Sequence, residues 1–322
     1  MAEDNLSAVL YGIDDLRMEQ RPIPTPGPGQ LLIRVHTVGI CGSDVHYWTH
    51  GAIGSFVVRA PMVLGHETSG VVAGIGDNVK GFNVGDKVAM EPGLPCKGCE
   101  QCKKGRYNLC LDMKFFATPP IHGTLARFVT HDADFCYKLP EHVSFEEGAL
   151  LEPLSVAVHT CNRANIKMGE RVLIMGAGPI GTLCMMTAKA SGAGQVVIAD
   201  LDEGRLQQAK KLGADHILNT KGKSVAQITE EAVALLGRAP DATLECTGAG
   251  PCINTGIMAA IKEVDIRGIF RYVNSYPTAL ELVATRRIDL SGLTRATYTL
   301  EETIEAFKRT QKADVVKVFI TC

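Results

Sequence analysis

The feature that most constrains the fold is a short apolar run that leads directly into a glycine turn. Residues 171–178 read RVLIMGAG, and the turn continues as GAGPIG over residues 176–181. An apolar run of this length, ended by glycine, is typical of a strand that is buried on both faces. An apolar stretch with helical spacing follows it, so the pattern predicts a βαβ unit within a parallel sheet.

Strand and helix patterns continue to alternate after this turn. We predict strands over residues 195–200, 215–219 and 242–248, and helices over residues 203–212 and 224–236. Alternation of this kind is the signature of a parallel sheet that is covered by helices on its faces.

The first 150 residues have a different texture. They are rich in glycine and proline and alternate turns with β-like runs such as 31–39 and 71–76, which favours an antiparallel β domain with long loops. The texture changes near residue 153, where residues 153–164 have helical spacing. A chain of 322 residues is longer than one hydrophobic core usually serves, so two domains are expected.

The C-terminal segment returns to the first texture. Thr299 and Glu302 form a T-x-x-E capping box at the start of a helix, and residues 315–320 read as a strand. We therefore predict an α/β chain whose first domain comprises residues 1–153 plus 273–322 and whose second comprises residues 154–272.

Composition excludes several classes of function. The net charge of −2 gives no basic field that would favour nucleic acid or an anionic membrane as a partner. No apolar run approaches the ~20 residues of a membrane span, and the acidic start lacks the order of a signal peptide. A cytoplasmic location is expected. In a reducing compartment, the eleven cysteines favour metal or redox chemistry over disulfides.

Four of the cysteines lie on one short loop. Gaps of two, two and seven residues separate Cys96, Cys99, Cys102 and Cys110. Four thiolates can close a tetrahedron around Zn²⁺ with no open position, which defines a structural site. An iron–sulfur cluster fits less well, because ferredoxin-type runs end with a three-residue gap and a proline. Four unliganded thiols are the remaining alternative.

The glycine turn carries a dinucleotide-binding fingerprint. Gly176, Gly178 and Gly181 match G-x-G-x-x-G after a predicted strand and before a helix, and Asp200 follows at roughly the expected 20-residue interval. Such glycines let a pyrophosphate approach the helix N-terminus. A carboxylate at Asp200 would bind the ribose hydroxyls and repel a 2′-phosphate, which favours NAD over NADP. A structural turn with a surface aspartate is the alternative reading.

A second group of metal ligands is predicted around residues 64–70, which read LGHETSG and set His66 beside Glu67. Ionisable groups in so apolar a stretch need a partner. Cys41, which lies upstream between Gly39 and Gly42, is a candidate third ligand. Three protein ligands leave one coordination position open, as in a catalytic zinc site. Glu152, at the predicted domain boundary, supplies a further carboxylate. A buried histidine with an exposed glutamate is the alternative.

At these residues the sequence resembles the zinc-dependent medium-chain dehydrogenase/reductase superfamily, and within it the polyol dehydrogenases. The resemblance runs almost from end to end and is carried by the segments GICGSDVHYW, PMVLGHE, the four-cysteine loop, FFATPP, HGTLARF, FCYKLP, LLEPLSV, GAGPIG and IRGIFRY. It implies a GroES-like, mainly antiparallel β catalytic domain that binds zinc and a Rossmann, doubly wound domain that binds NAD.

The resemblance also implies roles for single residues. Catalytic zinc would be held by Cys41, His66 and Glu67, with Glu152 holding the zinc-bound water or the substrate and Ser43 relaying a proton. The polyol hydroxyls would contact Tyr47, Arg271 and Tyr272. The cofactor would contact Gly176, Gly178, Ile180, Gly181, Asp200 and Arg205, and on its nicotinamide side Ile269, Phe270 and Arg271. Each aromatic residue could equally serve core packing.

The implied activity is oxidation of a polyol such as sorbitol to a ketose such as fructose, with NAD as the hydride acceptor and zinc as catalytic and structural metal. The family also implies a homotetramer. Two alternatives remain open at this point: a non-catalytic zinc- and nucleotide-binding isoform, and a zinc-dependent alcohol or threonine dehydrogenase.

The sequence departs from the family in the second domain. The doubly wound fold has six strands, but here PCINTGIMAAI (251–261) runs directly into KEVDIRGIFRY (262–272), and about two dozen residues that would form the fifth strand are absent. Either residues 266–270 slide into the fifth position, giving five strands, or the domain is weakened and hydride transfer is impaired while the zinc and adenosine sites stay intact.

Overall fold

The computed structural model describes residues 4–260, 265–312 and 314–322. The chain forms two compact units: Met1–Glu152 with Thr294–Cys322, and Pro153–Leu293. The second boundary lies later than residue 273, where the sequence placed the return to the first domain. The reason is local, because the Gln208 side chain donates to the Gly292 carbonyl at 2.7 Å and ties the segment before residue 293 to the second unit.

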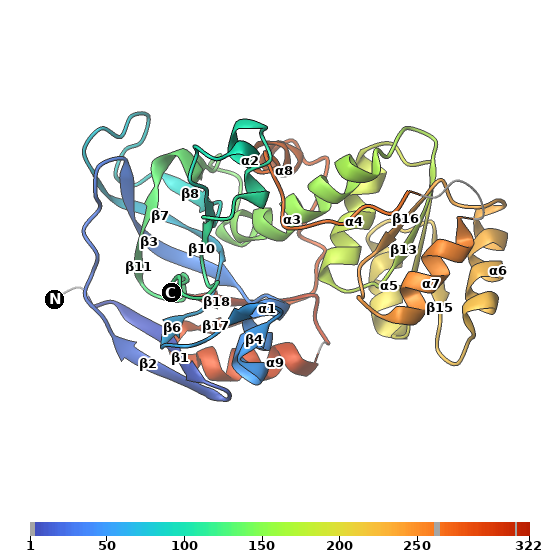
Figure 1. The fold of residues 1–322 in the computed structure, drawn as a ribbon, viewed down its shortest axis with the longest axis horizontal. Coiled ribbons are helices and arrows are strands. Elements are labelled where there is room, and N and C mark those ends of the chain that lie inside the picture. The colour runs from blue at the N-terminus through green and yellow to red at the C-terminus, as the bar shows by residue number, and fades with distance from the viewer. Residues whose placement is uncertain (1–3, 261–264, 313) are drawn as a thin grey trace. The chain divides into compact units, whose positions relative to one another are not determined.

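A mixed sheet forms the centre of the first unit (Figure 1). Among the described residues it has seven strands: β12 (Cys136–Lys138), β8 (Lys87–Met90), β7 (Glu67–Ile75), β3 (Gln30–Gly39), β18 (Lys317–Thr321) and β17 (Arg295–Thr299) in that order, with β11 (Phe128–Asp132) also paired with β3. All pairs are antiparallel except β17 with β18. The predicted antiparallel β domain is therefore confirmed.

Smaller elements surround this sheet. The short strands are β1 (Leu6–Gly12), β2 (Asp15–Gln20), β4 (Ala52–Ile53), β5 (Phe56–Val57), β6 (Met62–Val63), β9 (Gly93–Leu94) and β10 (Lys114–Phe115). The helices are α1 (Gly42–His50), α2 (Glu100–Lys103) and α9 (Thr303–Lys312), and α3 (Phe145–Ala164) runs from the first unit into the second. The predicted capping box of Thr299 and Glu302 is present before α9. None of the helices in the described part of the chain could cross a membrane.

Strand β3 shows how the sequence builds this unit. Leu31, Ile33 and Val35 are buried and alternate with more exposed residues, as expected for a strand with one face on the core. From Thr37 to Ile40 every residue is buried. The strand thus passes from an ordinary half-exposed position into the interior just before Cys41.

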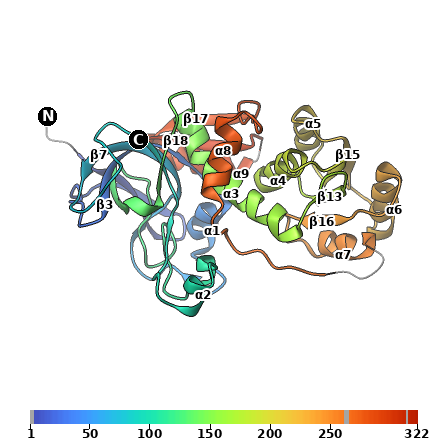
Figure 2. The ribbon, with the colours of Figure 1, turned by 90° about the horizontal axis from the view of Figure 1, so that it is seen from above.

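The second unit contains a parallel sheet with strand order β15-β14-β13-β16 over its described residues. The strands are β13 (Arg171–Met175), β14 (Gln195–Asp200), β15 (His216–Asn219) and β16 (Ala242–Glu245), and the helices are α4 (Pro179–Ala190), α5 (Glu203–Lys211), α6 (Val225–Leu236), α7 (Gly250–Ala259) and α8 (Tyr276–Ala284). Helices α4 and α5 cover one face and α6 and α7 the other (Figure 2). This is the predicted βαβ alternation of a doubly wound fold.

As the sequence indicated, a fifth strand is not formed in the described part of the second unit. Residues 266–270 lie outside any strand, so the described sheet has four strands and β16 is its edge. Of the two outcomes considered, the one in which IRGIF slides into the fifth position is therefore wrong. Arg267 donates to the Arg163 carbonyl at 2.7 Å, near the end of α3, which holds the segment alongside α3 instead of β16. Ile266 is 79% exposed as a result.

Candidate active site and metal centres

The three predicted catalytic-zinc ligands come together. One ligand atom each from Cys41, His66 and Glu67 lies within 4.8 Å of the others. Antiparallel pairing of β3 with β7 produces this meeting, because Gly39 lies opposite Glu67 and Cys41 follows two residues later as the N-cap of α1. His66 and Glu67 are buried, at 6% and 1% exposure.

Asp44 orients this group. Its carboxylate accepts hydrogen bonds from the amides of Cys41 at 3.1 Å and Gly65 at 2.9 Å, and Oδ1 lies 3.5 Å from Nδ1 of His66. Burial lowers the pKa of His66, but the Asp44 carboxylate raises it, and the net pKa lies well above its ordinary value. Since Asp44 engages the Nδ1 side of the ring, Nε2 is the nitrogen available to a metal, as carboxylate–histidine–zinc triads require.

A buried lysine completes the surroundings of the triad. The Lys317 ammonium forms an ion pair with Oε2 of Glu67, and its side chain is 4% exposed. Burial lowers the pKa of Lys317, but Glu67 and the Cys41 and Glu152 side chains outweigh burial and raise it. Gly39 leaves the room for this pair, because a Cβ there would lie 2.2 Å from Oε2 of Glu67 and 2.8 Å from Cε of Lys317.

The remaining predicted residues of this unit lie on two helices. Glu152 is buried on α3 at 5% exposure and is close enough to influence the pKa of Lys317, but it is not among the three side chains whose ligand atoms lie within 4.8 Å. Ser43 and Tyr47 lie on α1, where Tyr47 is 3% exposed. One thiolate, one imidazole and one carboxylate are donors that suit zinc and leave an open position, so the triad fits a catalytic metal.

The four-cysteine loop has the geometry of a tetrahedral site. Cys96, Cys99, Cys102 and Cys110 form the second cluster of ligand atoms within 4.8 Å, and all four are free thiols. The Sγ atoms of Cys99 and Cys102 lie 3.5 Å apart, and those of Cys96 and Cys102 lie 4.0 Å apart. Four sulfurs at about 2.3 Å from zinc lie roughly 3.8 Å from one another, so the loop fits structural zinc.

Backbone amides donate hydrogen bonds to two of the four cysteine sulfurs. The amide of Cys96 donates to Sγ of Cys110 at 3.4 Å, and the amide of Cys99 donates to Sγ of Cys96 at 3.3 Å. The amides of Gly98 and Cys99 lower the pKa of the Cys96 thiol to about 7. Zinc binds the thiolate, so Cys96 is partly in its metal-binding form near neutral pH.

A buried carboxylate connects the loop to the sheet. Glu91 is 1% exposed and accepts hydrogen bonds from the hydroxyls of Tyr107 at 2.6 Å and Tyr137 at 2.8 Å. Tyr107 lies between the third and fourth cysteines, whereas Tyr137 lies on β12. Nε2 of His131 donates to the Glu91 carbonyl at 2.7 Å. These contacts fix the position of the loop on the sheet.

The glycine turn of the second unit has the packing that its spacing predicts. A Cβ at Gly181 would lie 1.8 Å from the Gly176 carbonyl oxygen, so helix α4 can approach β13 only because residue 181 is glycine. Gly176 has a φ of 102°, which is strained for any other residue. A Cβ at Gly178 would meet no atom within 4 Å. The turn therefore leaves open space at the N-terminus of α4, where Ile180 also lies.

Asp200 ends β14 beside this turn. Its Oδ2 accepts a hydrogen bond from the Ala177 amide at 2.7 Å, and Oδ1 accepts one from the Asp202 amide at 2.9 Å. Each carboxylate oxygen has a second lone-pair direction left for a hydroxyl donor. Arg205 lies in the first turn of α5, whose N-cap is Asp202. The structure thus brings Asp200 to the turn that contains Gly176 and Gly178.

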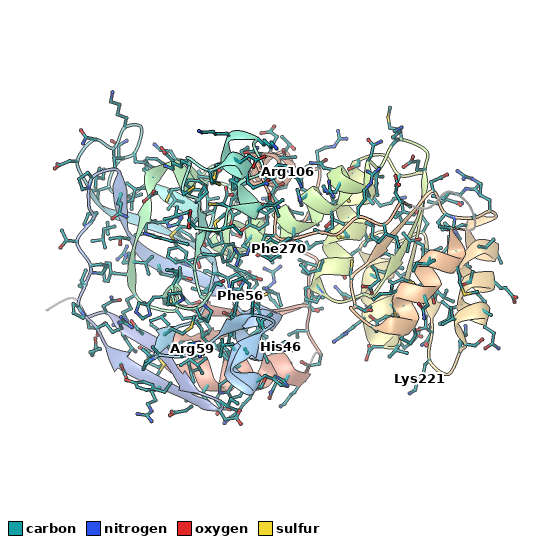
Figure 3. The ribbon with its side chains drawn as sticks, in the orientation of Figure 1. His46, Phe56, Arg59, Arg106, Lys221 and Phe270 are labelled. Carbon is teal, nitrogen blue, oxygen red and sulfur yellow. The ribbon has the colours of Figure 1, made fainter. Side chains whose placement is uncertain are left out.

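The residues predicted for the nicotinamide and the polyol lie on the irregular segment after α7. Phe270, labelled in Figure 3, is 45% exposed and Ile269 is 37% exposed. The Arg271 guanidinium lies 4.9 Å from the centre of the Phe270 ring, and Arg271 has a φ of 52°. Tyr272 is buried, with its ring 5.7 Å from that of Tyr276. Their predicted roles stay predictions.

Sequence reasoning missed Asp44 and Lys317. Asp44 had a local signal, because an acidic residue three positions after a helix N-cap is a capping pattern. Lys317 had a weaker one: a single lysine within the apolar strand pattern VVKVFI, which is costly to bury unless it is paired. Its partner depends on the pairing of β18 with β3, and no local pattern indicates that pairing.

Comparison with known families agrees with both units. Residues 27–141 match the family described as Alcohol dehydrogenase GroES-like domain, and residues 179–262 match the family described as Zinc-binding dehydrogenase. The second match ends where the sequence departs from the six-strand pattern.

Similar proteins cover nearly the whole chain. The sorbitol dehydrogenase of Bos taurus is 48% identical over 343 residues, covering 99% of this chain and 96% of that protein, and that of Homo sapiens is 47% identical with the same coverage. The alignment with the bovine protein exceeds the 322 residues of this chain by 21, so the relative contains residues that this chain lacks. The solved structure of L-idonate 5-dehydrogenase from Escherichia coli is 29% identical, with a TM-score of 0.90 and 99% of each chain covered.

The order of the two units, the two clusters of metal ligands and the full-length identity to relatives lead to the same assignment. The chain belongs to the zinc-dependent medium-chain dehydrogenase family.

Proposed function

We propose that this chain is a zinc- and NAD-dependent polyol dehydrogenase that oxidises sorbitol or a similar polyol to a ketose. The observation that carries the proposal is the meeting of Cys41, His66 and Glu67 within 4.8 Å in a chain that is 48% identical to a sorbitol dehydrogenase. The four-cysteine loop serves as a separate structural site.

Cys41, His66 and Glu67 would hold the catalytic zinc. When bound, zinc supplies a Lewis acid that makes a coordinated hydroxyl more acidic. Asp44 fixes the orientation of the His66 ring through its Nδ1 side. The Glu152 carboxylate accepts the hydroxyl proton, directly or through water, and Ser43 relays it.

The glycine turn holds the cofactor. Gly176, Gly178 and Gly181 would leave room for the pyrophosphate at the N-terminus of α4, and Ile180 would contact the cofactor. Asp200 accepts hydrogen bonds from the adenosine ribose hydroxyls, and its charge disfavours a 2′-phosphate. Arg205 lies along the adenosine side, and Ile269 and Phe270 along the nicotinamide.

Tyr47, Arg271 and Tyr272 hold the polyol through its remaining hydroxyls. Bound NAD would supply the hydride acceptor, so a polyol that gave up a hydride and a hydroxyl proton would leave as a ketose, with NADH as the second product. Specificity for a polyol follows from polar side chains that are left unpaired when a hydroxyl is missing.

One observation favours a second candidate, a non-catalytic zinc- and nucleotide-binding protein. The described part of the second unit has four strands, and the segment with Ile269 and Phe270 is outside the sheet. A misplacement of about 1 Å at a hydride-transfer site can cost ~100-fold in rate. On this basis we expect impaired turnover with intact metal and adenosine binding.

The resemblance to the polyol dehydrogenases also suggests an assembly. We propose a cytoplasmic homotetramer with no nucleic-acid or membrane partner, in line with a net charge of −2. A simple alcohol or threonine as substrate is tested by the substrate panel below.

Metal analysis and a sorbitol/NAD assay test the proposal together. Wild-type protein should contain about two zinc ions per chain and reduce NAD with sorbitol in preference to ethanol or threonine. Cys41→Ser should lose one zinc and all turnover, whereas Cys252→Ser, on α7 outside both clusters, should keep both. Two zinc ions without turnover would support the non-catalytic candidate, and a zinc content that is unchanged in Cys41→Ser would refute the catalytic site.

A further inference from the structure

The buried lysine beside the metal ligands is not explained by the proposed chemistry. Lys317 is the first residue of β18, and the pairing of Phe319 with Gly39 brings its side chain to the end of β3. The Ile40 amide donates to the Val318 carbonyl at 2.9 Å, which fixes this register. The last strand of the chain therefore places an ammonium group inside the metal site.

The lysine has one close anionic partner in the described structure, which is Glu67. The two side chains are 4% and 2% exposed and form an ion pair. Lysine is almost never buried without a partner, and burial of either charge alone is costly. The pair also fills the space over Gly39, where no side chain fits.

The side chains around the site carry more negative charge than a divalent metal alone would match, and Lys317 offsets part of the excess. Cys41 as thiolate, Glu67 and Glu152 contribute three negative charges, whereas Asp44 is directed at His66. A divalent metal leaves one of the three negative charges unmatched. The Lys317 ammonium, paired with Glu67, supplies the missing positive charge.

We propose that Lys317 is a positioning residue that holds Glu67 toward the metal and weakens the grip of the site on zinc by sharing the Glu67 carboxylate. This inference rests on the metal site of the proposed function. An ammonium group near a divalent cation repels it, and at low exposure water screens this repulsion weakly. Glu67 is 1% exposed and confined by Gly39, so it loses little order when the lysine is removed. For zinc affinity, the repulsion between the Lys317 ammonium and the metal therefore outweighs the ordering of Glu67 that the lysine provides.

Metal affinity tests the proposal without reference to turnover. Full-length protein is stripped of metal and titrated with Co²⁺, then with Zn²⁺ in competition. The triad has one thiolate and the loop has four, so their sulfur-to-cobalt absorption bands differ in intensity and separate the two sites. Lys317→Met keeps the length of the side chain and removes its charge, and Lys317→Arg keeps the charge.

We expect the triad of Lys317→Met to bind zinc at least tenfold more tightly than wild type, and that of Lys317→Arg to stay within about threefold. The four-cysteine loop should be unchanged in both. An affinity in Lys317→Met that is equal to or weaker than that of wild type overturns the proposal, as does an equal change in Lys317→Arg.

A second comparison covers the case in which Lys317→Met does not fold. The double variant Glu67→Gln with Lys317→Met removes both partners of the buried ion pair, so neither is left without the other and the variant should fold. Its triad should bind zinc at least tenfold more tightly than that of Glu67→Gln alone, and no difference between them overturns the proposal.

The same titration distinguishes failure of the inference from failure of the proposed function. If Cys41→Ser leaves both cobalt bands unchanged, the triad holds no metal and the proposed function fails with the inference. If Cys41→Ser removes one band but Lys317→Met binds zinc like wild type, only the role of Lys317 is wrong.

Discussion

Acid stability of the first unit should depend on His131. This histidine lies on β11, is 1% exposed, donates from Nε2 to the Glu91 carbonyl at 2.7 Å and packs against the Phe116 ring at 4.6 Å. Burial lowers its pKa from 6.5 to about 4. The folded state thus holds the neutral ring at pH values where the unfolded chain is already protonated.

The direction and size of the effect follow from this difference. Because the folded pKa is depressed, the contribution of His131 to stability is fully present above the unfolded pKa of 6.5 and is lost as pH falls through the folded pKa of about 4. One unit of pKa difference is worth about 1.4 kcal/mol, so the contribution lost between about pH 7.5 and pH 4 is roughly 3 kcal/mol.

Urea unfolding, followed by tryptophan fluorescence, measures this loss. The chain has one tryptophan, Trp48, which is buried in the first unit, so the signal reports on the unit that contains His131. His131→Gln keeps a donor for the Glu91 carbonyl but does not titrate. The stability difference between wild type and His131→Gln should shrink by about 3 kcal/mol from pH 7.5 to pH 4.

Other groups that titrate in this range do not affect the comparison, because both proteins contain them. Glu91 has a pKa raised by burial, and acid should also release the structural zinc in both proteins. A stability difference that stays constant with pH would show that His131 is not buried as a neutral ring and would refute the reasoning.

Two further predictions concern the cofactor turn and the structural loop. Gly178→Ala should fold normally and lose at least tenfold in NAD affinity by calorimetric titration, because its Cβ meets no protein atom and projects into the predicted pyrophosphate space. Gly181→Ala should instead destabilise the second unit by about 3 kcal/mol in thermal unfolding, because its Cβ would lie 1.8 Å from the Gly176 carbonyl oxygen. Tyr107→Phe and Tyr137→Phe each remove one hydrogen bond to the buried Glu91 carboxylate and should each lower the free energy of unfolding by about 1–3 kcal/mol. Only Tyr107→Phe should speed zinc release to a chelator, because only Tyr107 lies on the cysteine loop. Equal release rates from the two variants would contradict this role of Tyr107.

Local patterns were sufficient for much of the fold. The alternation over residues 171–248 corresponds to β13, β14, β15 and β16 with their helices. Buried parallel strands and their turns have strong local signals in apolar runs and glycines. The cysteine quartet was equally legible, because all four ligands lie on one loop and their spacing alone defines the site.

Features that depend on strand pairing had weaker signals in the sequence. Cys41 joins His66 and Glu67 through the register of β3 with β7, and the sequence suggested this meeting mainly through resemblance to a family. The ion pair of Lys317 with Glu67 joins residues from opposite ends of the chain, and its pattern in sequence is one lysine in an apolar strand. Contacts between residues this far apart in the chain produce no periodic pattern in the sequence.

The edge of the second sheet shows a different limit on what the sequence can predict. The sequence indicated that a segment is absent after α7, but the fate of residues 266–270 depended on competition between two environments. IRGIF has β-forming residues, yet it lies outside any strand, and Arg267 donates a hydrogen bond to the Arg163 carbonyl near the end of α3. Propensity did not decide this outcome, because tertiary context can override it.

The position of the absent strands in the sheet determines which step of the reaction their absence affects. In the doubly wound fold, the adenosine half of a dinucleotide contacts the first strand, the N-terminus of the following helix and the end of the second strand. These elements correspond to β13, α4 and β14, which this chain retains. In the doubly wound order, the missing strands would extend the sheet beyond β16, on the side opposite β14 and toward the nicotinamide half. Nucleotide affinity and hydride transfer should therefore separate in this chain. NAD should bind with ordinary affinity through Gly178 and Asp200, while the rate of sorbitol oxidation reports how well residues 265–271 substitute for the absent strands.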